Sequence, residues 1–466
     1  MTSSPLQKAV LVGLQLPKMN DQELASSLQE LTRLVTTLGY QVIGQVTQKR
    51  STDKSLSVLG SGKLSELAKW TGGTGVVAAK VEHKKSKAAL KWEEDSKEEF
   101  QEDDLEEIEI EESEELPEIT ESAEIVIVDT EMSPSQLRNL ESATGVTVLD
   151  RTGVIIEIFS RHARTKAASL QVEIARLTYI APRLRETGGS SERQGGGVGG
   201  RGAGETALEL DKRKIRDRIK ELKTEIAAIG NEDEVRRLRR KQEATVALVG
   251  YTNAGKSSLM RALTGSEVLV ADKLFATLDT TIRPLHPESI PKILISDTVG
   301  FIKKLPHDLV ASFKSTLDEA LHASLLLFVV DGSDPEFRSQ LAVTKNVLAD
   351  VGATEVPSLL ILNKRDNLSS ELAEKLRVEF PEAIFISTRN KDDIKNLRDK
   401  ILSYFESDMI TESLFIPYSA KGLVGEVRSR MRVLTEDYDE KGVTLKVRAK
   451  KETVNQLQKK LEKSSE

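Results

Sequence analysis

The sequence contains no cysteine among its 466 residues. Neither disulfides nor thiolate metal sites can stabilise the chain, so a secreted disulfide scaffold is excluded and a reducing compartment is expected. Long apolar runs are also missing, because stretches such as residues 325–330 fall far short of the roughly 20 residues that a membrane span needs. No basic-then-apolar leader with a cleavage site precedes the apolar residues 9–14. We therefore expect a soluble, cytoplasmic protein that is not embedded in a membrane.

Length and charge describe a multidomain chain with one unusual segment. At about 150 residues per domain the chain predicts about three domains, and a hydrophobic fraction of 38% is enough to give each a core. Residues 93–124 hold 18 Asp or Glu and a single basic residue, Lys97, whereas the rest of the chain carries a surplus of 10 positive charges. We interpret the segment as a solvated acidic insert. The basic remainder is compatible with a polyanionic partner such as nucleic acid.

The first part of the chain alternates between strand and helix patterns. Residues 21–38 form a helical pattern, and the short apolar runs typical of strands are residues 9–14, 41–46, 125–128 and 146–149. We predict an N-terminal α/β subdomain over residues 1–160 that contains the acidic insert 93–124.

Two helical stripes follow over residues 161–243 and predict an antiparallel helical hairpin. Their apolar residues recur at spacings of three and four: Leu170, Ile174, Leu177, Ala181 and Leu184, then Ile215, Ile219, Leu222, Ile226 and Ile229. The connection, residues 188–204, holds nine of the 29 glycines and cannot pack a core of its own. It is either a flexible linker or a tip that probes a partner.

From residue 244 the pattern changes to buried strands separated by helices. Its nearly continuous apolar runs are residues 245–249, 293–296, 325–330, 358–362 and 383–386. Such runs predict a parallel sheet covered on both faces, over residues 244–406. Residues 407–466 predict a small C-terminal α/β domain with strands at 413–416 and 443–447.

A P-loop follows the first of these strands. Its motif is Gly250-Tyr251-Thr252-Asn253-Ala254-Gly255-Lys256-Ser257, with Ser258 next in the chain. Glycines let backbone N–H groups wrap phosphates, Lys256 reaches the outer phosphates, and the Ser257 hydroxyl is placed for Mg²⁺.

Two further motifs end strands of the same predicted sheet. Asp297-Thr298-Val299-Gly300 ends one strand, so that Asp297 can hold the Mg²⁺ shell and the Gly300 N–H can face the terminal phosphate. Asn363-Lys364-Arg365-Asp366 ends another. Its carboxylate can accept hydrogen bonds from N1 and N2 of guanine, and adenine offers no such pair of donors. The three motifs together predict a guanine-nucleotide site.

The sequence resembles the HflX family of ribosome-associated GTPases, within the translation-factor-related P-loop superfamily. Besides the P-loop, the stretches that carry the resemblance are residues 59–67 (LGSGKLSEL), 133–141 (SPSQLRNLE), 148–153 (VLDRTG), 170–173 (LQVE) and 202–209 (GAGETALE). The fold class that we expect is therefore α/β: a P-loop GTPase domain with a parallel-type sheet, preceded by a small α/β subdomain and an antiparallel helical hairpin, and followed by a small α/β domain.

The resemblance implies a GTPase that binds the large ribosomal subunit and its ribosomal RNA, and promotes dissociation of stalled or idle ribosomes. It further implies Mg²⁺ as cofactor and GTP or GDP as bound nucleotide. We expect a monomer that does not bind DNA. Two alternatives stay open. One is an RNA chaperone or helicase that also uses ATP, and the other is a GTP-switched protein that docks on the ribosome without remodelling it.

The resemblance also assigns residues that the motifs alone do not. Phe275-Ala276-Thr277-Leu278-Asp279 looks like the family's first switch, with Thr277 as second protein ligand of Mg²⁺ beside Ser257. Ser387, Thr388 and Arg389 look like the final base-contacting motif. Lys256 and Gly300 are the expected catalytic residues.

Two positions bear on mechanism. Phe301 stands where many small GTPases place a water-orienting glutamine, and its side chain can neither donate nor accept a hydrogen bond. We therefore expect slow intrinsic hydrolysis that a partner or a retracting switch completes. Asn253 either holds a monovalent cation, as in some related GTPases, or is a turn asparagine.

Overall fold

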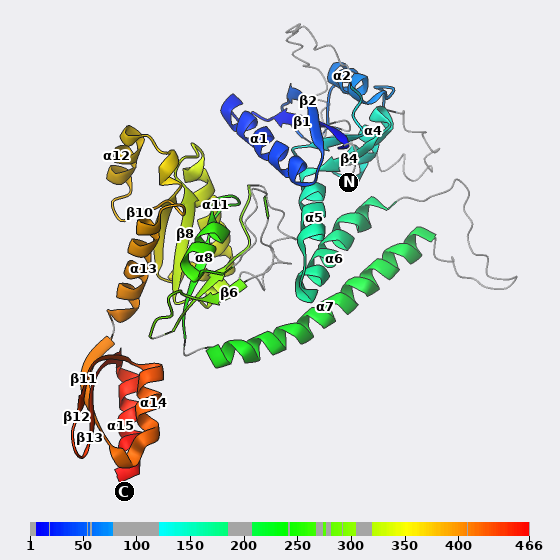
Figure 1. Cartoon of the computed structure of the whole chain (residues 1–466). Coiled ribbons are helices and arrows are strands. Elements are labelled where there is room, and N and C mark those ends of the chain that lie inside the picture. Colours follow the sequence, from blue (N-terminus) through cyan, green and yellow to red (C-terminus); the bar gives the residue numbers. More distant parts are fainter. Residues whose placement is uncertain are drawn as a thin grey trace, which may run out of the picture. The chain divides into compact units, whose positions relative to one another are not determined.

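The structure is a computed structural model that places two compact units, Met1–Val154 and Ile155–Glu466 (Figure 1). It describes residues 6–17, 19–53, 55, 58–77, 121–184, 207–240, 243–266, 274–275, 281–290, 292–303, 319–407 and 409–465. The predicted acidic insert up to residue 120 and the predicted glycine-rich tip 188–204 lie outside these residues.

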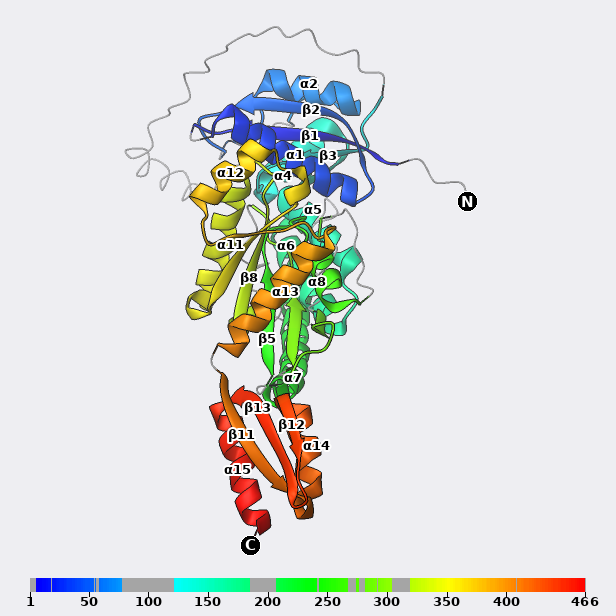
Figure 2. The ribbon, with the colours of Figure 1, turned by 60° about the vertical axis from the view of Figure 1, so that its left-hand side comes forward.

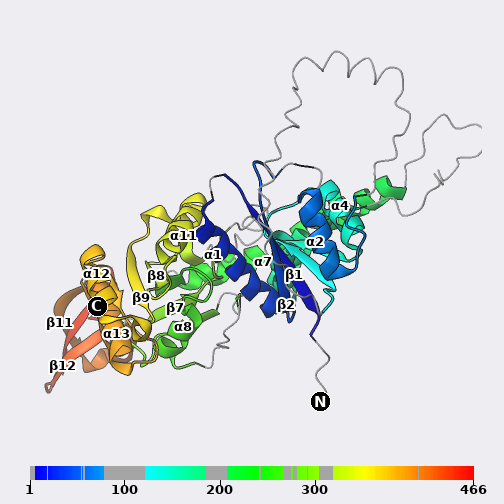
Figure 3. The ribbon, with the colours of Figure 1, turned by 90° about the horizontal axis from the view of Figure 1, so that it is seen from above.

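The first unit contains a four-stranded sheet in the order β2-β1-β3-β4. All neighbouring strands are parallel. The strands are β1 (Lys8–Gln15), β2 (Gln41–Lys49), β3 (Ile125–Val128) and β4 (Thr147–Asp150). Helix α1 (Asp21–Thr37) covers one face, and α2 (Ser61–Thr71) and α4 (Pro134–Thr144) cover the other (Figure 3). Since both faces are covered, β1 is apolar almost throughout, as the sequence predicted.

Helix starts in this unit follow from capping residues in the sequence. Asn20 accepts a hydrogen bond from the Glu23 backbone N–H at 2.7 Å, and the Glu23 carboxylate accepts one from the Asn20 N–H at 3.0 Å. Ser133 and Gln136 form the same reciprocal pair at the start of α4. Each such box satisfies two N–H groups that a helix leaves without an intrahelical partner.

The VLDRTG stretch has a structural role at the start of α5 (Arg151–His162). The Asp150 carboxylate accepts a hydrogen bond from the Gly153 N–H at 2.8 Å, and so caps the helix. Arg151, with its side chain 2% exposed, donates to Asp129 at 2.7 Å and also pairs with Glu30. Removal of one member of a buried ion pair destabilises a fold more than removal of one member of an exposed pair. This cluster therefore fixes the carboxyl ends of β3 and β4.

The predicted helical hairpin is formed by α6 (Lys166–Ile180) and α7 (Ala207–Arg240). Leu170, Ile174 and Leu222 form its buried core. Two ion pairs join Lys166 to Glu225 and Arg218 to Glu173. Because the partner's residue number falls as the chain advances along α6, the two helices run antiparallel.

The second unit is built around a six-stranded sheet in the order β10-β9-β8-β5-β7-β6. The strands are β5 (Ala244–Val249), β6 (Thr281–Pro284), β7 (Ile293–Asp297), β8 (Leu325–Asp331), β9 (Ser358–Asn363) and β10 (Ile384–Phe385). Five of these strands are parallel, and β6 pairs antiparallel with β7 at the edge. The parallel-type sheet confirms the prediction, whereas β6 was not foreseen.

Helices cover both faces of this sheet. α8 (Lys256–Thr264) and α13 (Lys391–Glu406) contribute to one core cluster with alternate residues of β5 and β8. α11 (Phe337–Val351) packs on β8 through residues outside that cluster, so it lies on the opposite face (Figure 2). α12 (Ser370–Glu379) follows β9.

The chain ends in a three-stranded antiparallel sheet in the order β11-β13-β12. Its elements are β11 (Met409–Pro417), α14 (Lys421–Arg430), β12 (Arg432–Tyr438), β13 (Gly442–Lys450) and α15 (Lys451–Ser465). Both helices pack on one side of the sheet and enclose a separate apolar core (Figure 1). The three sheets and the hairpin together confirm the predicted α/β fold class. No helix among the described residues is long and apolar enough to cross a membrane.

Candidate nucleotide-binding site

The predicted motifs meet at one edge of the six-stranded sheet. Residues 250–257 follow β5, Asp297 ends β7 and Asn363 ends β9, and these strands run parallel. Direct contacts join the motifs: Ser257 Oγ donates to Asp297 Oδ2 at 2.8 Å, and Asn363 Nδ2 donates to the Ala254 carbonyl at 2.9 Å. The carboxyl edge of a parallel sheet is where ligands bind in such folds.

Two glycines are required by the shape of the phosphate loop. Gly250 has φ of 155°, and a Cβ there would lie 2.1 Å from the Val329 carbonyl oxygen. Gly255 has φ of 93°, and a Cβ there would lie 2.2 Å from Asn363 Nδ2. Helix α8 begins directly after Gly255, so its first N–H groups and its dipole are directed at the loop.

Lys256 is held inside this loop. Its Nζ donates to the carbonyls of Gly250 at 3.0 Å and Tyr251 at 2.8 Å, and only 6% of the residue is exposed. Burial lowers the pKa of Lys256 to about 8, and the nearby charge of Asp297 partly opposes that shift. A phosphate would add negative charge beside this amine and favour its protonated form.

The oxygen atoms of Ser257 and Asp297 fit a magnesium site. A hydroxyl and a fully buried carboxylate lie within hydrogen-bond distance of each other, and Mg²⁺ prefers such oxygen ligands. Among the described residues no group of three His, Cys, Asp or Glu is placed to hold a metal ion. Mg²⁺ usually takes only one or two protein carboxylates and completes its shell with water and phosphate, so the sparse set is suitable. Thr277, the other expected ligand, lies outside the described residues.

The predicted base-recognition motif, residues 363–366, has contacts on each side. Lys364 has φ of 59° and pairs through Nζ with Asp331 Oδ2 at 2.7 Å. A hydrogen bond from the Ser387 side chain is the main cause that lowers the pKa of Asp366, and the charges of Arg389 and Lys364 act in the same direction. The Asp366 carboxylate therefore stays ionised at neutral pH and available as an acceptor.

The last predicted motif lies beside Asp366. The Ser387 N–H donates to Asp393 Oδ2 at 2.8 Å, and Arg389 Nη1 reaches Asp366 Oδ2 at 3.4 Å. Thr388 follows in the same turn before α13. Ser387 and Arg389 therefore lie beside Asp366, whereas their contact with a base stays a prediction.

Residues 300–303, which continue the Asp297-Thr298-Val299-Gly300 motif and are named the second switch, lie directly on the phosphate loop. Thr252 N–H donates to the Phe301 carbonyl at 2.8 Å, and Phe301 N–H donates to the Gly250 carbonyl at 3.1 Å. Phe301 is 3% exposed. The sequence identified Phe301 only as the residue that stands in place of a water-orienting glutamine. In the structure, its backbone forms a β-bridge with Tyr251.

Of the predicted first switch, only Phe275 is described, and Ala276, Thr277, Leu278 and Asp279 lie outside the described residues. Phe275 is 3% exposed and adopts φ of 57°, which is rare for a bulky residue and marks a conformation imposed by its surroundings. Its ring packs on Phe159 of α5. Sequence reasoning missed Phe159, because a phenylalanine in an apolar helix pattern carries no local signal of this contact.

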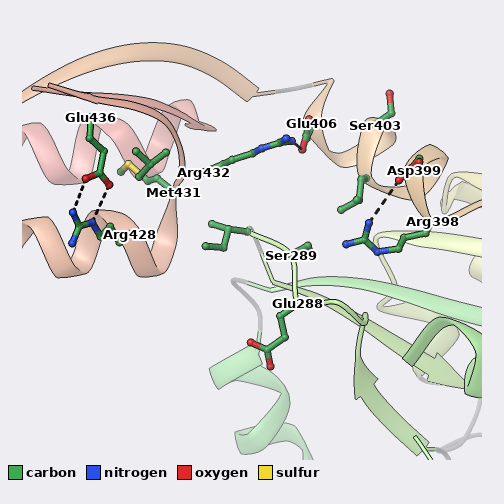
Figure 4. A pocket seen from close by; sticks show the side chains of 13 residues that line it. Glu288, Ser289, Arg398, Asp399, Ser403, Glu406, Arg428, Met431, Arg432 and Glu436 are labelled. Atoms are coloured by element: carbon green, nitrogen blue, oxygen red, sulfur yellow. Dashed lines mark hydrogen bonds and ion pairs between the residues drawn. The ribbon is translucent and has the colours of Figure 1, made fainter. Parts of the chain in front are cut away.

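A separate cleft of about 670 Å³ lies away from the motifs, between α13 and the C-terminal sheet (Figure 4). Six of its seven charged side chains pair with one another: Arg428 with Glu436 at 2.6 Å, Arg398 with Asp399 at 3.6 Å, and Arg432 with Glu406. Since its three arginines are already paired and no predicted motif reaches it, we do not assign the nucleotide to this cleft.

Comparison with known families covers most of the chain. Residues 25–90 and 91–160 match a family described as GTP-binding GTPase N-terminal, residues 162–240 match the GTP-binding GTPase middle region, and residues 245–364 match the 50S ribosome-binding GTPase family.

Several full-length relatives carry the name GTPase HflX. The chain is 55% identical to the protein of Gluconacetobacter diazotrophicus over 460 residues, which cover 99% of each chain. It is 34% identical to the protein of Escherichia coli over 428 residues, which cover 91% of this chain and 88% of that relative. Among solved structures, a GTP-binding protein from Sulfolobus solfataricus in complex with GDP is 23% identical, with a TM-score of 0.41, and the match covers 85% of this chain and 98% of that chain.

Proposed function

Because this chain belongs to the HflX family of GTPases, and therefore binds and hydrolyses GTP, we propose that it acts on ribosomes. It associates with the large ribosomal subunit and its ribosomal RNA, and its GTP form promotes dissociation of stalled or idle ribosomes. We further propose that it works in the cytoplasm as a monomer and does not bind DNA.

The observation that carries the placement of GTP is the convergence of three motifs on one sheet edge. The loop from Gly250 to Ser258 holds the phosphates through its backbone N–H groups, and Asp366 recognises guanine. Lys256 stabilises the charge that develops on the transferred phosphoryl group, and the Gly300 N–H orients the terminal phosphate. Asn363, Ser387, Thr388 and Arg389 surround the base. This assignment rests on the contacts among Ser257, Asp297, Ala254 and Asn363 described above.

Ser257, Asp297 and Thr277 would hold Mg²⁺, which when bound neutralises charge on the phosphates. No glutamine follows Gly300, and Phe301 is buried and bonded to the phosphate loop. The chain's own residues therefore bind and orient GTP but leave the attacking water without a side-chain partner at this position. Hydrolysis is slow until the ribosome completes the site.

Support for a ribosomal partner comes from the name of the matched family over residues 245–364, which is 50S ribosome-binding GTPase. The surplus of positive charge outside the acidic segment favours binding to ribosomal RNA. Residues 188–204, which connect α6 to α7 in the sequence, are the segment that enters the ribosome.

Sedimentation with separated ribosomal subunits tests the proposal. We expect the chain to pellet with large subunits in a non-hydrolysable GTP analogue, less so in GDP, and to speed GTP turnover when large subunits are added. Light scattering of intact ribosomes then separates dissociation from docking. Binding without a fall in scattering would support the GTP-switched docking protein instead, and ATP turnover of similar rate would favour the RNA chaperone.

A further inference from the structure

The phosphate loop and the second switch are joined by more than one contact. Two backbone hydrogen bonds, Thr252 N–H to Phe301 O at 2.8 Å and Phe301 N–H to Gly250 O at 3.1 Å, form a short parallel bridge. Beyond this bridge the Tyr251 hydroxyl accepts a hydrogen bond from the Lys303 backbone N–H at 2.6 Å. Tyr251 therefore also holds the switch at Lys303, two residues beyond Phe301.

Tyr251 also contacts the phosphate-binding lysine. Its carbonyl accepts a hydrogen bond from Lys256 Nζ at 2.8 Å, and Tyr251 is only 5% exposed. The same residue thus holds the lysine with its backbone and the switch with its side chain. A buried phenol hydroxyl normally takes part in a hydrogen bond, and the Lys303 N–H supplies one to Tyr251.

The attachment brings Gly300 close to the lysine amine. A Cβ on Gly300 would lie 3.1 Å from Lys256 Nζ and 2.9 Å from Thr252 Cα. This side of Gly300 is therefore filled by Thr252 and Lys256. It has no space for a phosphate group unless the switch moves off the loop.

We propose that the Tyr251 hydroxyl is a positioning group of the GTPase cycle, which holds residues 301–303 on the phosphate loop and is released when a terminal phosphate binds. It weakens binding of triphosphate relative to diphosphate, because only the triphosphate requires the switch to leave. The proposal rests on the proposed placement of the nucleotide in residues 250–257.

A second anchor holds the same switch residue from another direction. Lys303 Nζ pairs with Glu336 Oε2 at 2.9 Å, next to the start of α11. These two side chains are 27% and 34% exposed, so solvent weakens the pair. Glu336→Gln therefore loosens the same segment without touching the phosphate loop, and its effect should have the same direction as loss of the Tyr251 hydroxyl but a smaller size.

Tyr251→Phe removes the hydroxyl and keeps the ring, so it tests the proposal in the full-length protein. Fluorescent GDP and a fluorescent non-hydrolysable GTP analogue are titrated into each variant with Mg²⁺ present. We expect the Kd for the GTP analogue to fall about three- to tenfold, the range of one net hydrogen bond, while the Kd for GDP changes less than about twofold. Tyr404→Phe, which removes a hydroxyl from α13, is the matched control and should change neither value.

Hydrogen exchange of the Lys303 amide gives a second readout. Without added nucleotide we expect this amide to exchange faster in Tyr251→Phe than in the parent, with a melting temperature lowered by only a few degrees. An unaltered ratio of the two Kd values, or equal weakening of both nucleotides, would overturn the role of the hydroxyl. Binding of guanine nucleotides in that result would leave the GTPase assignment intact, whereas a folded parent protein that binds neither nucleotide would contradict both.

Discussion

The rings of Phe159 and Phe275 meet edge to face, with centroids 4.6 Å apart and planes at 73°. Phe275 belongs to the predicted first switch, and Phe159 lies in α5. Both side chains are buried, at 3% exposure or less. A residue two positions before the proposed Mg²⁺ ligand Thr277 is thus fixed by a helix far from it in sequence.

We expect Phe159→Ala and Phe275→Ala each to lower the free energy of unfolding by about 3 kcal/mol, because each leaves a cavity. The double variant should lose about 1 kcal/mol less than the sum, since the edge-to-face contact is counted in both single variants. Urea denaturation of the four proteins measures this coupling. Phe415→Ala, whose ring is 48% exposed, serves as control and should cost little. Strict additivity would show that the two rings do not stabilise each other.

Base choice should depend on Asp366. Asp366→Asn replaces one carboxylate oxygen by an amide donor, so GTP binding should weaken by about 2–3 kcal/mol while xanthine nucleotides gain affinity. Calorimetric titration with GDP and xanthosine diphosphate measures both changes. Asp350→Asn, on the exposed side of α11, is a control of the same chemistry. Unchanged GDP affinity in Asp366→Asn would remove guanine recognition from this loop.

Lys256 should give the protein a distinctive pH dependence. The pKa of Lys256 in the folded state, about 8, lies below the ordinary value of 10.5. Burial of the charged amine therefore lowers the free energy of unfolding by its full amount below pH 8, and this cost disappears between pH 8 and 10.5. Relative to Lys256→Met, the parent should therefore gain as much as about 3 kcal/mol of stability across that window. Urea denaturation without nucleotide at pH 7, 8.5 and 10 tests this slope, and parallel pH profiles would contradict it. Lys256→Met should also lose tight binding of GDP and GTP.

The glycine-rich connection should matter for ribosomes and not for folding. Residues 188–204 cannot contribute to an apolar core, so deletion of residues 195–202 should leave the melting temperature and basal GTP hydrolysis nearly unchanged. Dissociation of intact ribosomes, followed by light scattering with GTP, should fail in this variant. Splitting at the parental rate would exclude the tip from the remodelling step and leave the GTPase intact.

The parallel strands and the three nucleotide motifs were predictable from sequence because each carries a local signal. A buried parallel strand is apolar over its whole length, and residues 250–257 follow one directly. The strand β12 escaped prediction because Arg432–Tyr438 is mostly exposed and polar, and it forms only by pairing with β13. The antiparallel edge strand β6 is likewise a four-residue element without an apolar run.

Contacts between distant residues were the part of the site that sequence reasoning could not supply. Tyr251 and Lys303 are 52 residues apart, and neither residue type indicates the other. The pair Phe159 and Phe275 is separated by a helical hairpin and the phosphate loop. Motifs identify which groups meet the nucleotide, whereas only the fold shows which groups hold those motifs in place.

The meeting of Gly255 with Asn363 has a consequence for how this protein can diverge. A side chain at position 255 would collide with the Asn363 amide, which itself donates to the Ala254 carbonyl. A substitution at position 255 therefore requires a change at Asn363 as well, and it would still be strained by the φ of 93°. Phosphate binding and base recognition are therefore coupled through Gly255 and Asn363. We expect a change of nucleotide preference to arise at Asp366 and its neighbours, while Gly255 and Asn363 stay unchanged.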